Sequence, residues 1–303
     1  MYNNKTKIGI IGGDSRQAAV CSYFANANAE CAVWGVDISH DFCPGCTDNI
    51  VKATDWRGAL KEAQAVILPL PVSADGIRLN CEQSLLKSDA YIPRLTEIIQ
   101  QVRKDTTIFG GRIPHSVLRF ATEHNVRMID YYEFEDFQIK NAVPTAEGAI
   151  SVAISEMNIT ISGSNAGVLG YGRIGRTLAT RLLALGSSVT CIARSKKDLA
   201  WAECDGCKVI KLNDFLNSNH SFNVIFNTVP YIIFDEKTIS SLPFGQLFID
   251  LASLTGGIDN VAAENHGIKV VKALSLPGKC SPKTAGKIIY ESVKDILLEE
   301  GVL

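Results

Sequence analysis

The sequence predicts an α/β protein with two doubly wound, Rossmann-like domains, each built on a parallel sheet. Two segments, residues 7–25 and 165–186, begin alike: an apolar strand-like run enters a glycine turn, and an amphipathic helical pattern follows. After each segment, strand-like and helix-like stretches alternate, which is typical of parallel sheets covered by helices on both faces. The 303 residues are enough for two domains of ordinary size.

Short apolar runs and amphipathic stretches predict the remaining elements. In the first half we expect strands near 31–36, 65–69, 107–109 and 126–129, and helices near 93–103 and 116–124. In the second half we expect strands near 188–193, 208–210, 223–227, 247–250 and 268–272, and helices near 197–203, 235–241 and 259–266.

A connecting helix is expected at the junction of the domains. Pro144 followed by Thr145, a residue type that caps helices well, predicts that the helix begins there. Its apolar residues share one face at helical spacing: Ala146, Ala149, Ile150, Ala153, Ile154 and Met157. A final helix, 283–303, is expected to pack back on the first domain and to leave a cleft between the lobes. The predicted domains are therefore 1–143 with 283–303, and 144–282.

Composition excludes several classes of protein. A net charge of −2 argues against a nucleic-acid-binding protein, which usually carries a basic face. No apolar run approaches the roughly 20 residues of a membrane-spanning helix. The N-terminal segment has no signal-peptide pattern, so we expect a cytoplasmic protein.

The nine cysteines suit a reducing compartment better than a disulfide framework. Two Cys-x-x-Cys pairs, Cys43/Cys46 and Cys204/Cys207, could together supply four thiolates to a metal. The pairs fall in different predicted domains, however, and each stands beside glycine. We therefore expect turn cysteines and no metal site.

The second domain opens with the full G-x-G-x-x-G spacing, placed between a strand and a helix. Gly170 permits the tight turn, Gly172 lets backbone approach a pyrophosphate, and Gly175 lets the helix pack on the strand. The helix that begins near Arg173 directs free N–H groups at the phosphates. Loops after two later strands should border the nicotinamide end. The other predicted cofactor-binding residues are Ile174, Asn227, Thr228, Val229, Pro230, Asp250 and Ala252.

The end of this domain's second strand carries cations where many dinucleotide-binding domains place an acidic residue. A carboxylate there binds the ribose hydroxyls of NAD and would repel the 2′-phosphate of NADP. Here the chain reads Arg194-Ser195-Lys196-Lys197. Arg194 can stack on adenine and pair with the phosphate, Ser195 can donate a hydroxyl, and Lys196 adds charge. We expect NADP rather than NAD; the alternative is a solvated basic turn with weak selectivity.

The first domain offers candidates for an anionic substrate. Its own glycine turn lacks the third glycine, so a second dinucleotide is not expected. Arg16 is the candidate partner of a small anion, although Asp14 and Arg16 could equally be a helix cap and a surface cation. After another strand come Arg112, His115 and Ser116. His115 is the candidate general acid or base, with a structural role as the alternative.

The segment 276–286 leaves the last strand of the nucleotide domain and should border the cleft. Lys283 or Lys279 could bind a carboxylate there, and Lys283 is the second candidate catalytic residue. The alternative is a solvated lysine, although a cation near a helix N-terminus is unfavourable for the helix dipole. The remaining predicted substrate-binding residues are Thr145, Ser281 and Thr284.

Taken in order, these motifs resemble those of the A subunits of dipicolinate synthases. The resemblance spans the chain and is carried by "GGDSRQ" (12–17), "PTAEG" (144–148), "LGYGRIG" (169–175), "ARS" (193–195), "DLAS" (250–253) and "LPG…PKTAG" (276–286). It implies oxidation of a dihydrodipicolinate-type ring to pyridine-2,6-dicarboxylate in the mother cell of a sporulating bacterium, with a nicotinamide cofactor accepting hydride. It also implies a partner, the flavoprotein-like B subunit of dipicolinate synthase.

Two other functions remain open from the residues. Enzymes related to D-2-hydroxyacid or alanine dehydrogenases share the two-lobe plan, but none of the five histidines here sits in a convincing catalytic pair. A nucleotide-sensing protein without turnover could use the same fold, because fold does not determine function. Self-association is also left open by the sequence.

Overall fold

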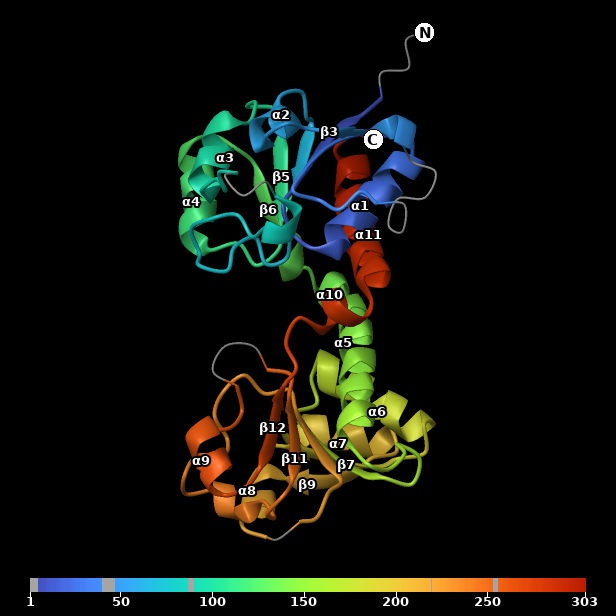
Figure 1. Cartoon of the computed structure of the whole chain (residues 1–303). Coiled ribbons are helices and arrows are strands. Elements are labelled where there is room, and N and C mark those ends of the chain that lie inside the picture. Colours follow the sequence, from blue (N-terminus) through green and yellow to red (C-terminus); the bar gives the residue numbers. More distant parts are fainter. Residues whose placement is uncertain (1–4, 40–46, 87–89, 219, 253–255) are drawn as a thin grey trace. The chain divides into compact units, whose positions relative to one another are not determined.

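The computed structural model describes residues 5–39, 47–86, 90–218, 220–252 and 256–303 (Figure 1). The chain divides into two compact units. One consists of Met1–Lys140 with Ser281–Leu303, and the other of Asn141–Cys280. Each unit holds one parallel six-stranded sheet.

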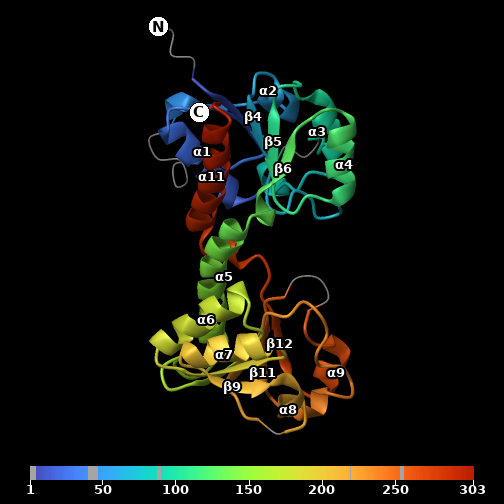
Figure 2. The ribbon, with the colours of Figure 1, turned by 180° about the vertical axis from the view of Figure 1, so that it is seen from behind.

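The first sheet has the strand order β3-β2-β1-β4-β5-β6. Buried aliphatic residues alternate along its strands, so that both faces are apolar. Helices α1 and α11 cover one face, and α2, α3 and α4 cover the other (Figures 1 and 2). The elements are β1 Lys7–Ile11, α1 Ser15–Asn26, β2 Glu30–Trp34, β3 Ile50–Lys52, α2 Trp56–Leu60, β4 Ala65–Ile67, α3 Leu95–Gln101, β5 Thr107–Gly110, α4 His115–Glu123, β6 Met128–Asp130 and α11 Pro282–Glu299.

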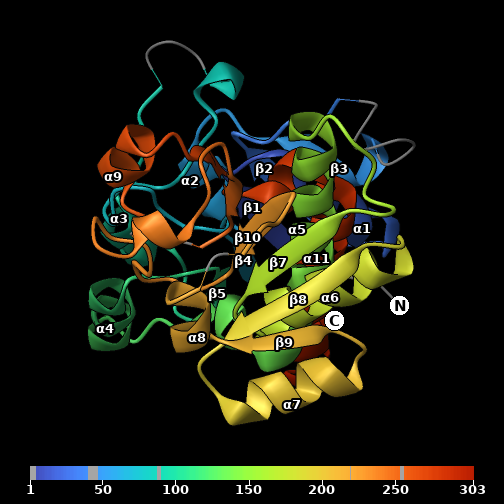
Figure 3. The ribbon, with the colours of Figure 1, turned by 90° about the horizontal axis from the view of Figure 1, so that it is seen from below.

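The second sheet has the order β12-β11-β10-β7-β8-β9, which is the same arrangement read from the other edge. Figure 3 shows β10, β7, β8 and β9 side by side, with α6 and α7 on one face and α8 and α9 on the other. The elements are α5 Glu135–Glu156, β7 Asn165–Leu169, α6 Arg173–Ala184, β8 Ser188–Ala193, α7 Lys196–Cys204, β9 Lys208–Lys211, α8 Leu212–Leu216, β10 Val224–Asn227, β11 Leu247–Asp250, α9 Asn260–Asn265, β12 Lys269–Lys272 and α10 Leu276–Cys280.

These two sheets confirm the predicted fold class. All strands are parallel, and in each sheet the order in which successive strands are added reverses at one point, between β1 and β4 and between β7 and β10. Ligands of open α/β sheets bind beyond the carboxyl ends of the strands at such a point. The C-terminal helix packs on the first domain as expected, since a Cβ at Gly286 would lie 2.5 Å from the carbonyl oxygen of Arg16.

The connecting helix differs from the prediction at its start. Helix α5 begins at Glu135 and carries Pro144 in its interior. Thr145 is therefore not an N-cap; its hydroxyl instead donates to the carbonyl of Asn141, one turn earlier, at 2.8 Å. The division between the two units, after Lys140, also falls inside this helix.

The helix predicted over 235–241 is wrong. Only a single 3₁₀ turn, Ile239–Ser241, forms there. The carboxylate of Asp235 accepts hydrogen bonds from the N–H groups of Lys237 and Thr238 at 3.0 and 2.9 Å. Such side-chain bonds offer the backbone an alternative to helical ones. The other departures are short elements that the pattern did not predict: β3, α2, α8 and α10.

Candidate functional site

The glycine turn after β7 has an open surface beside the start of α6. Gly170 has a φ of +85°, in the region that glycine populates most readily. A Cβ at Gly175 would lie 2.2 Å from the carbonyl oxygen of Gly170, so only glycine lets α6 approach the turn so closely. Gly172, by contrast, is the exposed N-cap of α6, and a Cβ there would meet nothing within 4 Å. No side chain caps this helix, so its first-turn N–H groups fit a pyrophosphate.

The carboxylate of Asp205 accepts hydrogen bonds from the glycine turn and from the first part of α6. The hydroxyl of Tyr171, which is 5% exposed, donates to Oδ2 of Asp205 at 2.9 Å. Arg176, one helical turn into α6, donates to the same carboxylate through Nε at 2.8 Å and Nη2 at 3.2 Å. These hydrogen bonds, first from Arg176 and then from Tyr171, lower the pKa of Asp205. Burial and the bond to Asp205 raise the pKa of Tyr171. The turn is therefore fixed before any ligand binds.

The cationic segment after β8 is exposed at the same edge of the sheet. Arg194, Ser195 and Lys196 are all exposed. The hydroxyl of Ser195 also caps α7, since it accepts from the N–H of Asp198 at 3.4 Å. The guanidinium of Arg194 lies 4.8 Å from the ring centroid of Tyr231, in the loop after β10. The sheet order therefore brings the predicted adenosine loop to the switch point.

The two predicted polar residues at the ends of β10 and β11 face each other. Asn227 is fully buried and donates through Nδ2 to Oδ1 of Asp250 at 2.8 Å. Asp250 also accepts from the N–H groups of Ala252 at 3.2 Å and Gly257 at 2.9 Å. Both side chains are thus occupied within the protein, and they shape the loops around the site.

The loop after β10 is also tied to the glycine turn. The hydroxyl of Thr228 donates to the carbonyl of Leu169 at 2.7 Å. A Cβ at Gly170 would lie 2.7 Å from that hydroxyl and 2.9 Å from a methyl of Val229. Pro230 is exposed and Ile174 is half-buried. The predicted residues of β7, α6 and β10 therefore converge on one edge.

The glycine turn of the first domain is covered by the chain itself. Gly12 and Gly13 have φ of +68° and +94°. The N–H of Gly13 donates to the carbonyl of Asn80 at 2.8 Å. A Cβ at Gly12 would lie 2.7 Å from that same carbonyl oxygen and 2.9 Å from Sγ of Cys81. The N–H of Gly13 is therefore used by the chain, and the N-cap of α1 is the side chain of Asp14, where α6 has the open Gly172.

The buried side chain of Arg16 forms an ion pair with Asp14, which is partly exposed. Its Nε and Nη2 lie 2.9 and 2.7 Å from Oδ1 and Oδ2 of Asp14, and its side chain is 9% exposed. Burial raises the pKa of Asp14, but the hydrogen bonds and charge of Arg16 outweigh it and leave the pKa below its ordinary value. Asp14 caps α1, which confirms the helix cap that the sequence offered as an alternative to anion binding. Arg16, however, is not a surface cation.

The candidates after β5 are exposed, and an aspartate binds the backbone at the first of them. Arg112 has a φ of +57°, which is uncommon for a residue with a side chain. The carboxylate of Asp130 accepts from the N–H groups of Arg112 and Ile113 at 3.0 and 2.6 Å. The guanidinium of Arg112 lies 5.2 Å from the ring centroid of Tyr132. His115 and Ser116 begin α4 and are exposed.

The candidates at the start of α11 lie beside the start of α1. Ser281 is the N-cap but makes no capping bond through its side chain. Lys283 and Thr284 follow in the first turn and are exposed. Because Gly286 touches Arg16, the structure brings these residues near that arginine. Thr145, in the other unit, is 8% exposed.

The cysteine pairs show no clustered ligands. Cys43 and Cys46 lie outside the described residues. Cys204 is exposed at the end of α7, and Cys207 is buried. Within the described ranges no group of three or more His, Cys, Asp or Glu side chains could hold a metal ion, and no helix there is long and apolar enough to cross a membrane.

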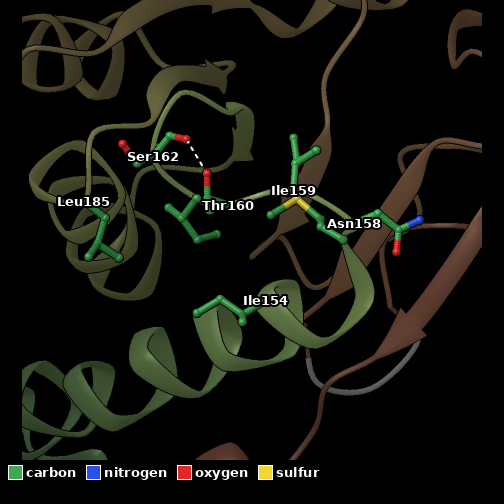
Figure 4. Close-up of a pocket in the computed structure, with 8 residues that line it drawn as sticks. Ile154, Asn158, Ile159, Thr160, Ser162 and Leu185 are labelled. Carbon is green, nitrogen blue, oxygen red and sulfur yellow. Dashed lines mark hydrogen bonds between the residues drawn. The ribbon is translucent and has the colours of Figure 1, made fainter.

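A separate depression lies at the opposite end of the second unit's strands. Its volume is about 650 Å³, and Ile154, Ile159 and Leu185 line it (Figure 4). Leu185 follows the C-terminal end of α6, whereas the glycine turn lies at the N-terminal end. Ile154 was predicted on the apolar face of the connecting helix, but its side chain is 58% exposed, so this prediction is wrong. This depression is not part of the nucleotide site.

Sequence reasoning missed the residues that support the site from behind. Asp205 lies in the Cys-Asp-Gly-Cys turn, where only the thiols drew attention. Tyr231 directly follows Pro230, which was predicted to bind the cofactor. An aromatic residue at the end of a predicted ligand-binding loop was the signal that could have identified it. Asp130 and Gly257 carried no signal of their own, because their contacts are distant in sequence.

Comparison with known proteins agrees with this geometry. Residues 7–132 match the family model of the N-terminal domain of the dipicolinate synthase A subunit, and residues 139–253 match "D-isomer specific 2-hydroxyacid dehydrogenase, NAD binding domain". The dinucleotide fold and its open glycine turn therefore define an oxidoreductase that uses a nicotinamide cofactor.

The full-length relatives identify the family. The A subunit of dipicolinate synthase from Bacillus subtilis (strain 168) is 30% identical over 298 residues, which cover 97% of this chain and 96% of that protein. The crystal structure of the dipicolinate synthase A subunit from Bacillus halodurans has a TM-score of 0.85 and 27% identity, over 96% of this chain and 97% of that one. The Bacillus subtilis structure has a TM-score of 0.82 and 29% identity, over 98% and 97%. The chain belongs to the family of dipicolinate synthase A subunits.

Proposed function

We propose that the protein oxidises a dihydrodipicolinate-type ring to pyridine-2,6-dicarboxylate with NADP as hydride acceptor, in the mother-cell cytoplasm of a sporulating bacterium. Family membership supports the substrate class. The observation that carries the cofactor assignment is the open turn at Gly172 together with the exposed Arg194 at the same edge of the sheet.

The residues at this edge fit a dinucleotide. The first turn of α6 would bind the pyrophosphate, and Arg194, Ser195 and Lys196 would bind the adenosine ribose and its 2′-phosphate. When bound, the cofactor supplies the ring that accepts hydride. The Asn227–Asp250 pair shapes the loops beside that ring and is itself buried from water.

The first domain would bind the dicarboxylate. Arg112 and Lys283 are exposed cations, and each could hold one carboxylate. Arg16 is a further candidate partner of a carboxylate; its guanidinium is paired with Asp14, and its backbone carbonyl lies against Gly286 of α11. Aromatisation removes one hydride and one proton from the dihydropyridine ring, and His115 is the candidate acceptor of the proton. We further propose that the flavoprotein-like B subunit of dipicolinate synthase completes the enzyme.

Nicotinamide absorbance tests the reaction directly. Turnover is expected with the dihydrodipicolinate-type substrate and NADP, and the assay is run with and without the B subunit. Arg112→Ala and Lys283→Ala should each raise the KM for the substrate about 10-fold, with unchanged NADP affinity. Oxidation of 2-hydroxy acids in place of the dihydropyridine would contradict the proposal.

The cofactor assignment has its own test. Replacing Arg194 with Glu and Ser195 with Ala should lower the preference for NADP over NAD by about one to two decades. Added salt should weaken NADP binding to the unchanged protein more than NAD binding, since only NADP carries the extra phosphate. Equal affinity of the unchanged protein for NADP and NAD would contradict the proposed preference for NADP.

A further inference from the structure

Arg194 differs from the neighbouring arginines of α6. Arg176 pairs with Asp205, and Arg181 pairs with Glu147. Among the residues that the structure describes, no carboxylate lies within ion-pair distance of Arg194; its one described contact is the ring of Tyr231, 4.8 Å from its guanidinium. A guanidinium on an aromatic ring uses its face and leaves its in-plane N–H donors available.

The position of this contact follows from the sheet. Arg194 follows β8 and Tyr231 follows β10, while β7 lies between these strands. The two outer strands are about 10 Å apart, so the pair reaches across the end of β7, where the glycine turn begins. Tyr231 is 37% exposed. The chain behind it is anchored, since the N–H of the buried Ile233 donates to the carbonyl of Gly257 at 2.9 Å.

We infer that Tyr231 is a positioning residue for Arg194: its ring holds the guanidinium plane over the turn, so that the free N–H groups face the ribose 2′-phosphate. This inference rests on the proposed use of NADP and extends it to the residue that sets the preference. A free arginine side chain would lose rotamer freedom on binding the phosphate. Here the contact with Tyr231 restricts the side chain beforehand.

The test uses two small probes, 2′,5′-ADP and 5′-AMP, which share the adenosine and differ in the 2′-phosphate. Tyr231→Leu keeps an apolar side chain but removes the aromatic face, and Tyr231→Phe keeps the face. By titration calorimetry, Tyr231→Leu should weaken 2′,5′-ADP about 10-fold and 5′-AMP less than about 2-fold. Tyr231→Phe should restore the affinity. Ile232→Ala, at the next residue of the same loop, is the matched control and should change neither.

A double-mutant cycle separates positioning from direct contact. In the Arg194→Ala background, Tyr231→Leu should produce no further loss, because the ring acts through the guanidinium. Additive losses, or equal weakening of both probes, would show that Tyr231 contacts the adenosine itself and would overturn the inference. An unchanged protein that binds both probes equally would remove the NADP assignment and this inference together. A 2′-phosphate preference that survives Tyr231→Leu overturns only the role of Tyr231.

Discussion

The two glycine turns of this molecule occupy equivalent places in two sheets of the same strand order, yet their surroundings differ. The first glycine is crowded in both turns, Gly12 by Asn80 and Gly170 by Thr228. The helix N-caps differ: a Cβ at Gly172 would meet nothing within 4 Å, whereas the N-cap of α1 is Asp14, whose carboxylate accepts from the N–H of Arg16. Arg16, after the first turn, is paired with Asp14. Arg194, at the second site, contacts an aromatic ring.

The difference shows that the supersecondary unit alone does not make a nucleotide site. Both turns follow a parallel strand and precede a helix, which is the arrangement that binds phosphates elsewhere. What distinguishes them is whether the protein itself uses the N–H groups beside the helix N-terminus: Asp14 caps α1, whereas no side chain caps α6. In the first domain Asn80 accepts the N–H of Gly13 at 2.8 Å, so that donor is not available to a ligand. One nucleotide per chain is the expected stoichiometry.

The largest expected effect comes from filling the open turn. Gly172→Val should weaken nucleotide binding about 100-fold or more, because the side chain would occupy the surface that a pyrophosphate approaches. The φ of Gly172 is −79°, and its surroundings are empty, so the fold should tolerate the change. Calorimetric titration gives the affinity, and thermal unfolding gives the stability.

This first variant separates a binding role from a structural one. A melting temperature within a few degrees of the unchanged protein, with binding lost, is the expected combination. Unchanged binding would remove this turn from the cofactor site.

A substitution at the first glycine of the covered turn should affect stability instead. Gly12→Ala should destabilise the protein by about 2–3 kcal/mol, since the φ is +68° and the Cβ would crowd Asn80 and Cys81. Gly76→Ala is the matched control: its φ is +77°, but nothing lies within 4 Å. It therefore carries the backbone strain without the crowding and should cost less.

Urea unfolding measures this difference, and nucleotide titration accompanies it. The folded Gly12→Ala protein should bind one nucleotide with unchanged affinity. A loss of nucleotide affinity in this variant alone would mean that the first turn takes part in binding, and the comparison between the two turns would fail.

The second glycine motif could be predicted from the sequence because its requirements are local. Gly170 and Gly175 touch each other within one turn, so their spacing is visible in the chain itself. The same reasoning predicted both sheets, since strands buried on two faces give short apolar runs. Where the contacting residues are close in sequence, the structure agrees with the prediction from the sequence pattern.

The covered first turn could not be predicted, because Asn80 is far from Gly12 in the chain and reaches it only through the fold. The side-chain bonds of Asp235 likewise replaced a predicted helix with a 3₁₀ turn. Pro144 was expected at a helix start, yet α5 passes through it and begins at Glu135. The contact of Asn80 depends on the fold, whereas the bonds of Asp235 are local and compete with helical backbone bonds.

A smaller effect is expected at the carboxylate behind the open turn. Asp205→Asn removes the charge that Arg176 contacts at 2.8 Å and leaves one acceptor oxygen for Arg176 and the Tyr171 hydroxyl, which now share two. The turn should be held less firmly, and nucleotide affinity should fall about 5-fold. Tyr171→Phe, which removes one bond only, should have a smaller effect. Affinities that match the unchanged protein would show that the turn needs no support from Asp205.

The smallest effect concerns pH and the ion pair of the covered turn. Arg16 keeps the pKa of Asp14 below its ordinary value of 3.8 when the protein is folded. The unfolded chain therefore takes up this proton first, so the pair contributes its full stability above pH 3.8 and loses it as the pH falls through the folded value. Asp14→Asn cannot gain this proton and should lose less stability than the unchanged protein as the pH falls below 3.8. Thermal unfolding across that range measures the difference, which should be modest because the carboxylate is partly exposed.

Nucleotide affinity at neutral pH should stay the same, since the open turn lies in the other sheet and does not use Asp14. Parallel stability curves for the two proteins would show that the ion pair does not contribute to stability in this pH range.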